Sequence, residues 1–172
     1  NLDGHDYVAK AFQAGASAAL VADDAKLEAT GILIRVPDTL DALNRLGAAA
    51  RARSGARVIA VTGSVGKTGT KEALRLALAP SGSVHASRKS YNNHWGVPLT
   101  LANFAREKDF GVFEVGMNHP GEITPLAKLI RPHIAIIITV ASVHLEFFTS
   151  EDQIAEAKAE IFTGLEPGGA AI

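Results

Sequence analysis

The residues best suited to chemistry lie in one short segment, Val58-Ile-Ala-Val-Thr-Gly-Ser-Val-Gly-Lys-Thr-Gly-Thr70. A wholly apolar run is followed there by a glycine-rich turn, then by Lys67 and Thr68, and then by a helical pattern. Backbone N–H groups of such a turn, together with the positive end of the following helix, attract an anion. Lys67 can reach the β- and γ-phosphates of a nucleotide, and the Thr68 hydroxyl can bind Mg²⁺. The segment therefore predicts a phosphate-binding loop.

This loop departs from the full pattern G-x-x-x-x-G-K-[ST], because Val61 stands where the first glycine belongs. What remains is the shorter Gly63-x-x-Gly66-Lys67-Thr68. The alternative is a tight strand-to-helix turn with an exposed lysine. The order of apolar run, turn, Gly-Lys-Thr and helical pattern favours the phosphate loop.

Two further candidates stand at or after the ends of other apolar runs. Open α/β sheets bind ligands at the carboxyl ends of their strands. Glu114 ends the run Phe110-Gly-Val-Phe-Glu, where a carboxylate is costly unless it is paired or bound to a metal ion. It stands where a nucleotide-binding fold needs its second Mg²⁺-binding acid; the alternative is an exposed residue on an edge strand. His144 comes shortly after Ile134–Val140 and can ligate a divalent ion, with Glu146 as a second ligand or an orienting partner. An ordinary loop histidine is the alternative.

Lys158 shares one helical stripe with Ile154, Ile161 and Leu165. A lysine on such a stripe can extend its amine to water, whereas burial would lower its pKa and favour the neutral amine. The segment Lys89–Pro98 carries Asn92 and Asn93 among hydroxyl and aromatic groups. It is suited to a polar ligand-binding loop, although asparagine and glycine are also plain turn residues.

Strand-like and helix-like patterns alternate along the chain, and this alternation predicts an α/β fold with a parallel sheet. We expect strands at Ala18–Ala22, Ile32–Val36, Val58–Val61, Phe110–Val115 and Ile134–Val140. We expect helices over Asp6–Ala14, over a segment capped by Asp38 and carrying Leu40, Leu43, Leu46 and Ala50, from the phosphate loop to Ala79, over Glu122–Ile130, and from a Ser150–Gln153 capping box through Leu165. The stretch from Arg51 to Gly55 is expected to separate a domain at 1–54 from one at 55–172.

Composition excludes several classes of protein. The formal net charge of −1 gives no reason to expect a nucleic acid or an anionic membrane as partner. There is no cysteine, hence no disulfide or thiolate site, and no apolar run approaches the roughly 20 residues of a membrane span. His5, His85 and His133 are expected to be structural or on the surface. The chain begins at Asn1 and its single methionine is Met117, so we expect a piece of a longer protein.

Together these segments resemble the Mur ligases, which form amide bonds in peptidoglycan precursors at the expense of ATP. The similarity covers nearly the whole chain. Its most subtype-specific parts, Tyr91-Asn-Asn-His-Trp-Gly-Val-Pro-Leu-Thr-Leu101 and Phe113-Glu-Val-Gly-Met-Asn-His-Pro-Gly-Glu-Ile123, resemble the dipeptide-adding members. The N-terminal part is similar to the later portion of the family's UDP-binding domain, and the rest to its central P-loop-type ATPase domain.

The resemblance implies a role for each matching residue. Thr62, Gly63, Ser64, Val65, Gly66, Lys67 and Thr68 would form the ATP loop, with Lys67 on the phosphates. Thr68 and Glu114 would hold a first Mg²⁺, and His144 would ligate a second. Lys158 falls where the family has a carbamylated lysine that helps to position the second ion. Asn92 and Asn93 would line the nucleotide-sugar and phosphate site. Many relatives have Asn where this chain has Thr139.

The implied activity is the addition of D-alanyl-D-alanine to UDP-N-acetylmuramoyl-tripeptide through an acyl phosphate, by a cytoplasmic monomer. The catalytic residues would be Lys67, His144 and Lys158. Another Mur ligase, a folate polyglutamate-type ligase and a non-catalytic ATP-binding fragment are the alternatives; the sequence has no Asn-Lys-x-Asp motif of a GTPase. The family's third domain has no counterpart here, so we expect the isolated chain to turn over little substrate.

Overall fold

The computed structural model describes residues 3–27, 31–141, 148 and 150–172. The chain divides into two compact units, Asn1–Leu43 and Asn44–Ile172. The division falls inside helix α2 (Thr39–Arg53). The assignment of domains to residues 1–54 and 55–172 stays a prediction. Among the described residues, no helix is both long enough and apolar enough to cross a membrane.

The first unit pairs two parallel strands with a short helical segment. A 3₁₀ turn (Gly4–Tyr7) and α1 (Val8–Gln13) precede β1 (Ala18–Ala22), which pairs in parallel with β2 (Ile32–Val36). His5 is structural, as predicted, since its Nε2 accepts a hydrogen bond from the backbone N–H of Ala22 at 3.0 Å. Both strands lie at the residues that the apolar pattern predicted.

Helix α2 begins as its sequence indicates. The carboxylate of Asp38 accepts hydrogen bonds from the N–H groups of Leu40 and Asp41 at 2.7 and 2.8 Å, which confirms the predicted cap. At the other end of α2, the buried Arg51 donates to the carbonyls of Ile130 and Arg131 at 2.7 and 2.8 Å. Arg51 thereby satisfies the end of a second helix, α5 (Ile123–Ile130), whose last carbonyls have no partner within the helix itself.

The second unit is built on a five-stranded parallel sheet in the order β4-β5-β3-β6-β7. Its strands are β3 (Arg57–Thr62), β4 (Val84–Ala86), β5 (Phe110–Glu114), β6 (Ile134–Ile137) and β7 (Ala170–Ala171). The central strand β3 is buried along nearly its whole length, as expected of a parallel strand covered on both faces. The predicted α/β fold with a parallel sheet is therefore confirmed.

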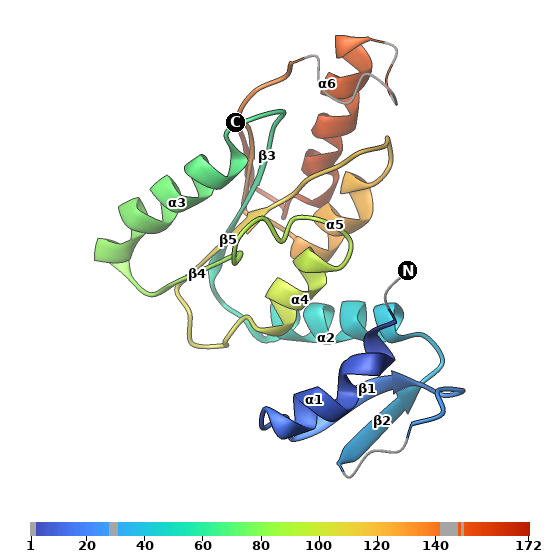
Figure 1. Ribbon diagram of the computed structural model, residues 1–172. Coiled ribbons are helices and arrows are strands. Elements are labelled where there is room, and N and C mark those ends of the chain that lie inside the picture. The colour runs from blue at the N-terminus through green and yellow to red at the C-terminus, as the bar shows by residue number, and fades with distance from the viewer. Residues whose placement is uncertain (1–2, 28–30, 142–147, 149) are drawn as a thin grey trace. The chain divides into compact units, whose positions relative to one another are not determined.

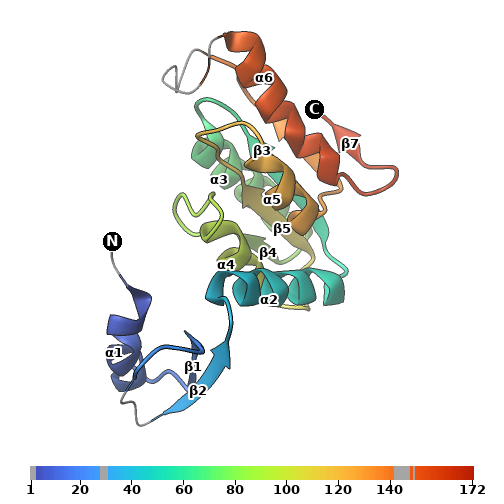
Figure 2. The ribbon, with the colours of Figure 1, turned by 90° about the vertical axis from the view of Figure 1, so that its right-hand side faces the viewer.

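Helices cover both faces of this sheet (Figure 1). On one face, α3 (Lys67–Leu78) packs against Ile59, Val61 and their neighbours. On the other face, α4 (Gly96–Ala102), α5 and α6 (Glu151–Ala159) enclose the larger core, and a 3₁₀ segment (Glu160–Gly164) continues α6. Figure 2 shows α5 and α6 in front of the sheet. Residues of β3 alternate between these two cores, so the strand and the loop that follows it are held from both sides.

The sequence missed β4 and β7, which have only three and two residues, and α4, which begins inside the Lys89–Pro98 segment that was predicted to be a polar loop. It also predicted too long a strand at Ile134–Val140, since β6 ends at Ile137. The three residues after Ile137 leave the sheet, although they are apolar or β-branched. The N–H of Ile138 still donates to the carbonyl of Thr62 in β3 at 3.0 Å, whereas the carbonyl of Thr139 accepts from the N–H of Ser64 in the loop after β3 at 2.9 Å.

Candidate functional site

The predicted phosphate loop joins the end of β3 to the start of α3. Val61, which stands where the longer motif has its first glycine, is fully buried. It belongs to the sheet, where it pairs in register with Glu114 and Ile136. Gly66 takes a left-handed backbone conformation (φ 85°) immediately before α3, which a residue with a side chain adopts only at a cost. The first N–H groups of α3 have no partner within the helix and lie at its positive end. The local geometry is that of an anion-binding loop.

The segment after β6 holds this loop in place. The N–H of Ser64 donates to the carbonyl of Thr139 at 2.9 Å, and the Ser64 hydroxyl bonds to both backbone groups of Ala141. The hydroxyl of Thr139 accepts from the N–H of Val65 at 3.3 Å and donates to its carbonyl at 3.2 Å. Thr139 thus supports the loop directly. These bonds explain why the apolar run after Ile137 is not strand.

Lys67 and Thr68 begin α3 beside the carboxylate of Glu114. The Thr68 hydroxyl donates to Oε2 of Glu114 at 3.0 Å. Nζ of Lys67 donates to the carbonyl of Gly63 at 2.6 Å. Partial burial lowers the pKa of Lys67, and the negative charge of Glu114 opposes that shift. The side chain of Lys67 therefore folds back on the phosphate loop, close enough to Glu114 for the two charges to interact.

Glu114 is nearly completely buried at the end of β5, with 1% of its surface exposed. Strand β5 lies between β4 and β3, so the alternative of an exposed residue on an edge strand is wrong. Its Oε1 accepts from the side-chain amide of Asn92 at 2.8 Å, and its backbone N–H donates to the hydroxyl of Ser87. The carboxylate is held by hydrogen bonds on both oxygens, which is how a buried acid is tolerated.

The two asparagines of the Lys89–Pro98 segment do different things. Asn92 reaches Glu114, and its carbonyl accepts from the N–H of Gly116 at 2.8 Å. Asn93 turns to the start of α4, where its side-chain oxygen accepts from the N–H groups of Trp95 and Gly96 at 3.2 and 2.9 Å. Only Asn92 joins the acid of the site in this structure. A ligand-binding role for Asn93 stays a prediction.

Lys158 of α6 is buried, with 2% of its surface exposed, on the same helix face as Ile154 and Ile161. The predicted apolar stripe is confirmed, and the amine does not extend to water as a surface lysine would. Burial lowers the pKa of Lys158 to about 8, and the positive charge of Lys67 adds to this shift. A substantial fraction of neutral amine near neutral pH is the requirement for reaction with carbon dioxide or another electrophile.

His144 and Glu146, the other predicted metal-binding residues, lie outside the described residues. Thr62 lies at the foot of the loop with its hydroxyl buried, and that oxygen has no hydrogen-bond partner among the described residues. A pocket of about 400 Å³ lies at the phosphate loop. Its lining consists of Ser64, Val65, Gly66, Lys67, Thr68, Gly69, Ser90, Asn92 and Glu114.

The sequence patterns did not point to Lys71, whose side chain is among the most deeply buried in the described part of the chain. Its Nζ donates to the carbonyls of Ser87 and Lys89 at 2.8 Å each and lies 3.3 Å from Oε1 of Glu72. Lys71, Leu74 and Leu78 follow the i, i+3, i+7 spacing of a helix face. That spacing was the available signal that Lys71 faces the interior.

Glu160 was overlooked as well. Its carboxylate accepts from the N–H of Gly121 at 2.6 Å and from the N–H and hydroxyl of Thr124 at 2.9 and 3.0 Å. It therefore caps the start of α5 from the segment that follows α6. His85 and His133 are structural, as predicted, because their rings bond to the backbone of Thr100 and Val58 at 3.0 Å.

Comparisons with known proteins agree with this geometry. The model of the family described as Mur ligase middle domain matches residues 61–172. The UDP-N-acetylmuramoyl-tripeptide–D-alanyl-D-alanine ligase of Rickettsia prowazekii is 42% identical over all 172 residues, which correspond to 38% of its own length. A crystal structure of MurF from Acinetobacter baumannii is 37% identical with a TM-score of 0.87, over 99% of this chain and 37% of that one.

MurF ligase from Thermotoga maritima, solved in complex with ADP, is 32% identical with a TM-score of 0.83, over 99% of this chain and 39% of that one. The chain thus spans less than two fifths of the relatives that it matches. The matched residues 61–172 contain the phosphate loop after Val61, Glu114 and Lys158. On this match, the chain belongs to the Mur ligase family.

Proposed function

We propose that the protein containing this chain is an ATP-dependent ligase that adds D-alanyl-D-alanine to UDP-N-acetylmuramoyl-tripeptide in peptidoglycan precursor synthesis. One observation carries the proposal. The phosphate loop, with Lys67 and Thr68, stands beside the buried acid Glu114 in a chain whose relatives at 37–42% identity include ligases of that name.

The oxygen ligands at the loop fit Mg²⁺. The hydroxyl of Thr68 and the carboxylate of Glu114 are 3.0 Å apart at the mouth of the loop, and hard oxygen ligands of this kind suit Mg²⁺. Mg²⁺ usually takes only one or two protein carboxylates and completes its shell with water and phosphate oxygens. When bound, the ion would neutralise charge on the transferred phosphoryl group. Thr68 and Glu114 are therefore the proposed ligands of a first Mg²⁺.

A second ion and a modified lysine complete the proposed site. His144 is the proposed ligand of the second Mg²⁺. Lys158 is the proposed carbamylated lysine, supported by its burial and by a pKa lowered to about 8. A carbamate forms only on a neutral amine, and it would replace a buried positive charge by a negative one near Lys67. That exchange of charge would favour a cation beside Lys158.

The chain's own residues account for the phosphoryl-transfer half of the reaction. The carboxylate of the tripeptide attacks the γ-phosphate of ATP and displaces ADP, and the acyl phosphate so formed is attacked by the amine of the dipeptide with release of phosphate. The amides at the start of α3 and the ammonium of Lys67 would hold the phosphates and offset their charge. Asn92 and Ser87 orient Glu114. Residues 1–54 are proposed to belong to the UDP-binding domain and 55–172 to the ATP-binding domain of a cytoplasmic monomer.

The test is a phosphate-release assay on the intact protein. With ATP, Mg²⁺, UDP-N-acetylmuramoyl-tripeptide and D-alanyl-D-alanine, we expect phosphate release that depends on both acceptor substrates. Lys67→Met should abolish it, whereas the matched variant Lys128→Met, on an exposed site of α5, should leave it unchanged. Tripeptides with lysine or diaminopimelate as third residue should be compared. Turnover with a folate and glutamate in place of these substrates would contradict the assignment, as would no turnover at all.

A further inference from the structure

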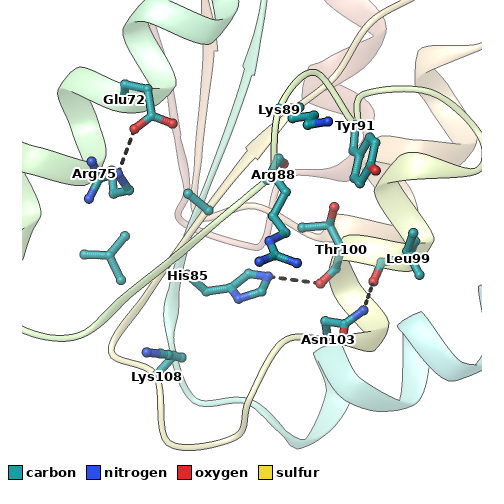
Figure 3. Close-up of a pocket in the computed structure, with 13 residues that line it drawn as sticks. Glu72, Arg75, His85, Arg88, Lys89, Tyr91, Leu99, Thr100, Asn103 and Lys108 are labelled. Atoms are coloured by element: carbon teal, nitrogen blue, oxygen red, sulfur yellow. Dashed lines mark hydrogen bonds and ion pairs between the residues drawn. The ribbon is translucent and has the colours of Figure 1, made fainter. Parts of the chain in front are cut away.

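A second pocket lies at the β4 edge of the sheet. It has a volume of about 690 Å³, within the size range of small-molecule sites. Its walls come from α3, β4, the segment after β4, α4 and the turn that precedes β5, and Figure 3 shows the residues that line it. The phosphate loop contributes no residue to this pocket.

The lining of this pocket is strongly cationic. Arg75, Arg88, Lys89 and Lys108 line it, against a single acidic residue, Glu72. The carboxylate of Glu72 is already engaged, because its two oxygens lie 2.7 Å from Nε of Arg75 and 3.3 Å from Nζ of the buried Lys71. The pocket therefore carries positive charge that its own acid does not balance.

Arg88 lies exposed on the segment after β4. In Figure 3 its side chain descends between β4 and α4 toward His85 and Thr100. Among the described residues, no hydrogen bond or ion pair engages its guanidinium. Guanidinium groups bind phosphate through two parallel hydrogen bonds, and an arginine left without a partner in a concave site is suited to that use.

The remaining walls of the pocket are neutral or apolar. Nε2 of His85 donates to the carbonyl of Thr100 at 3.0 Å. Burial lowers the pKa of the ring, the bond to Thr100 opposes that shift, and the charge of Lys108 adds to it. The imidazole is thus a neutral wall. Tyr91 and Leu99 are 42% and 41% exposed and add apolar surface at the rim.

We propose that this pocket binds a small molecule bearing a phosphate group, at a site separate from the phosphate loop, with Arg88 and Lys108 as its principal contacts. The pocket shares one segment with the nucleotide site. Ser87, Arg88, Lys89 and Tyr91 line the pocket, whereas the interleaved Ser90 and Asn92 face Thr68 and Glu114. One segment thus borders both sites.

The test is calorimetric titration of the intact protein with inorganic pyrophosphate as probe, at low salt, where such electrostatic contacts are least screened. We expect binding with a Kd below about 1 mM. In a Lys67→Met background, which weakens the phosphate loop as a competing pyrophosphate site, the double variant Arg88→Gln/Lys108→Gln should weaken the binding by roughly tenfold or more, because two charged donors are lost. Lys67→Met should leave this binding in place.

A matched control removes the same amount of charge elsewhere. Arg53→Gln/Lys128→Gln changes two exposed cations that do not line the pocket and should not alter the affinity. Loss of binding in Lys67→Met but not in Arg88→Gln/Lys108→Gln would place the probe at the phosphate loop and overturn the proposal. Equal loss in the control variant, or no binding by the unaltered protein, would overturn it too. None of these outcomes depends on ligase activity.

Discussion

Replacement of Lys71 by methionine tests how the segment from Ser87 to Asn92 is held in place. Methionine keeps most of the side-chain volume and removes the ammonium. Two hydrogen bonds, to the carbonyls of Ser87 and Lys89, are lost at a position with 1% of its surface exposed. Lys89 is also one of two described non-glycine residues with positive φ (47°), so its backbone needs support from outside.

The magnitude follows from these contacts. A hydrogen bond to a charged group contributes about 1.5–3 kcal/mol, and relief of the buried ammonium's own desolvation offsets part of the sum. We therefore expect Lys71→Met to lower the free energy of unfolding by about 2–4 kcal/mol, as measured by urea denaturation. Because Ser90 and Asn92 follow this support directly, the affinity for Mg²⁺-nucleotide should also fall, by about tenfold for each 1.4 kcal/mol of lost positioning.

Lys67→Met is the natural control, one helical turn earlier on α3. Its amine is partly exposed and makes one bond, to the carbonyl of Gly63, which water can replace. We expect a stability change of about 1 kcal/mol or less but a severe loss of nucleotide binding. If Lys71→Met changed neither the free energy of unfolding by more than about 1 kcal/mol nor the nucleotide affinity, the reasoning would be refuted.

Four further predictions concern charge and capping. Lys158 should react with ¹³C-bicarbonate in the absence of nucleotide, with a carbamate signal in ¹³C NMR that rises through pH 8; a midpoint near the ordinary value of 10.5 would contradict its burial. Lys67→Met should move that midpoint upward, because the charge of Lys67 lowers the pKa of Lys158. Glu114→Gln should raise the Mg²⁺ concentration needed for nucleotide binding by at least about tenfold, since a charged ligand becomes neutral; unchanged Mg²⁺ dependence would exclude Glu114 as a ligand. Arg51→Ala should lower the free energy of unfolding by about 3 kcal/mol through the uncapped end of α5, whereas the exposed neighbour Arg53→Ala should change it by less than about 0.5 kcal/mol.

Sequence patterns predicted the helices and strands that are determined by neighbouring residues, such as apolar runs and capping side chains. The apolar runs placed β1 and β2 at their residues, Asp38 capped α2, and the Ser150 hydroxyl accepts from the N–H of Gln153 at the start of α6. The sequence also brought Thr68 and Glu114 into one site, because the carboxyl ends of neighbouring parallel strands share an edge of the sheet.

What the sequence missed depends on contacts between distant residues. Thr139 lies outside β6 because it bonds to the phosphate loop. Its hydroxyl bonds to the backbone of Val65, 74 residues away in the sequence, and its carbonyl accepts from the N–H of Ser64. Lys71 is buried because two carbonyls of a later segment converge on it. In each case, a polar group's partner lies in a segment that no local pattern identifies.

Transfer of isotopic oxygen tests the central claim, that this site activates a carboxylate with ATP. The intact protein would be given UDP-N-acetylmuramoyl-tripeptide with ¹⁸O in its terminal carboxylate, together with ATP, Mg²⁺ and D-alanyl-D-alanine. An acyl phosphate requires one ¹⁸O of that carboxylate to leave with the released phosphate, which mass spectrometry detects. Labelled phosphate, formed with the amide product and lost in Lys67→Met, is the predicted result. Unlabelled phosphate would show that water, not the carboxylate, attacks ATP, and would contradict the account.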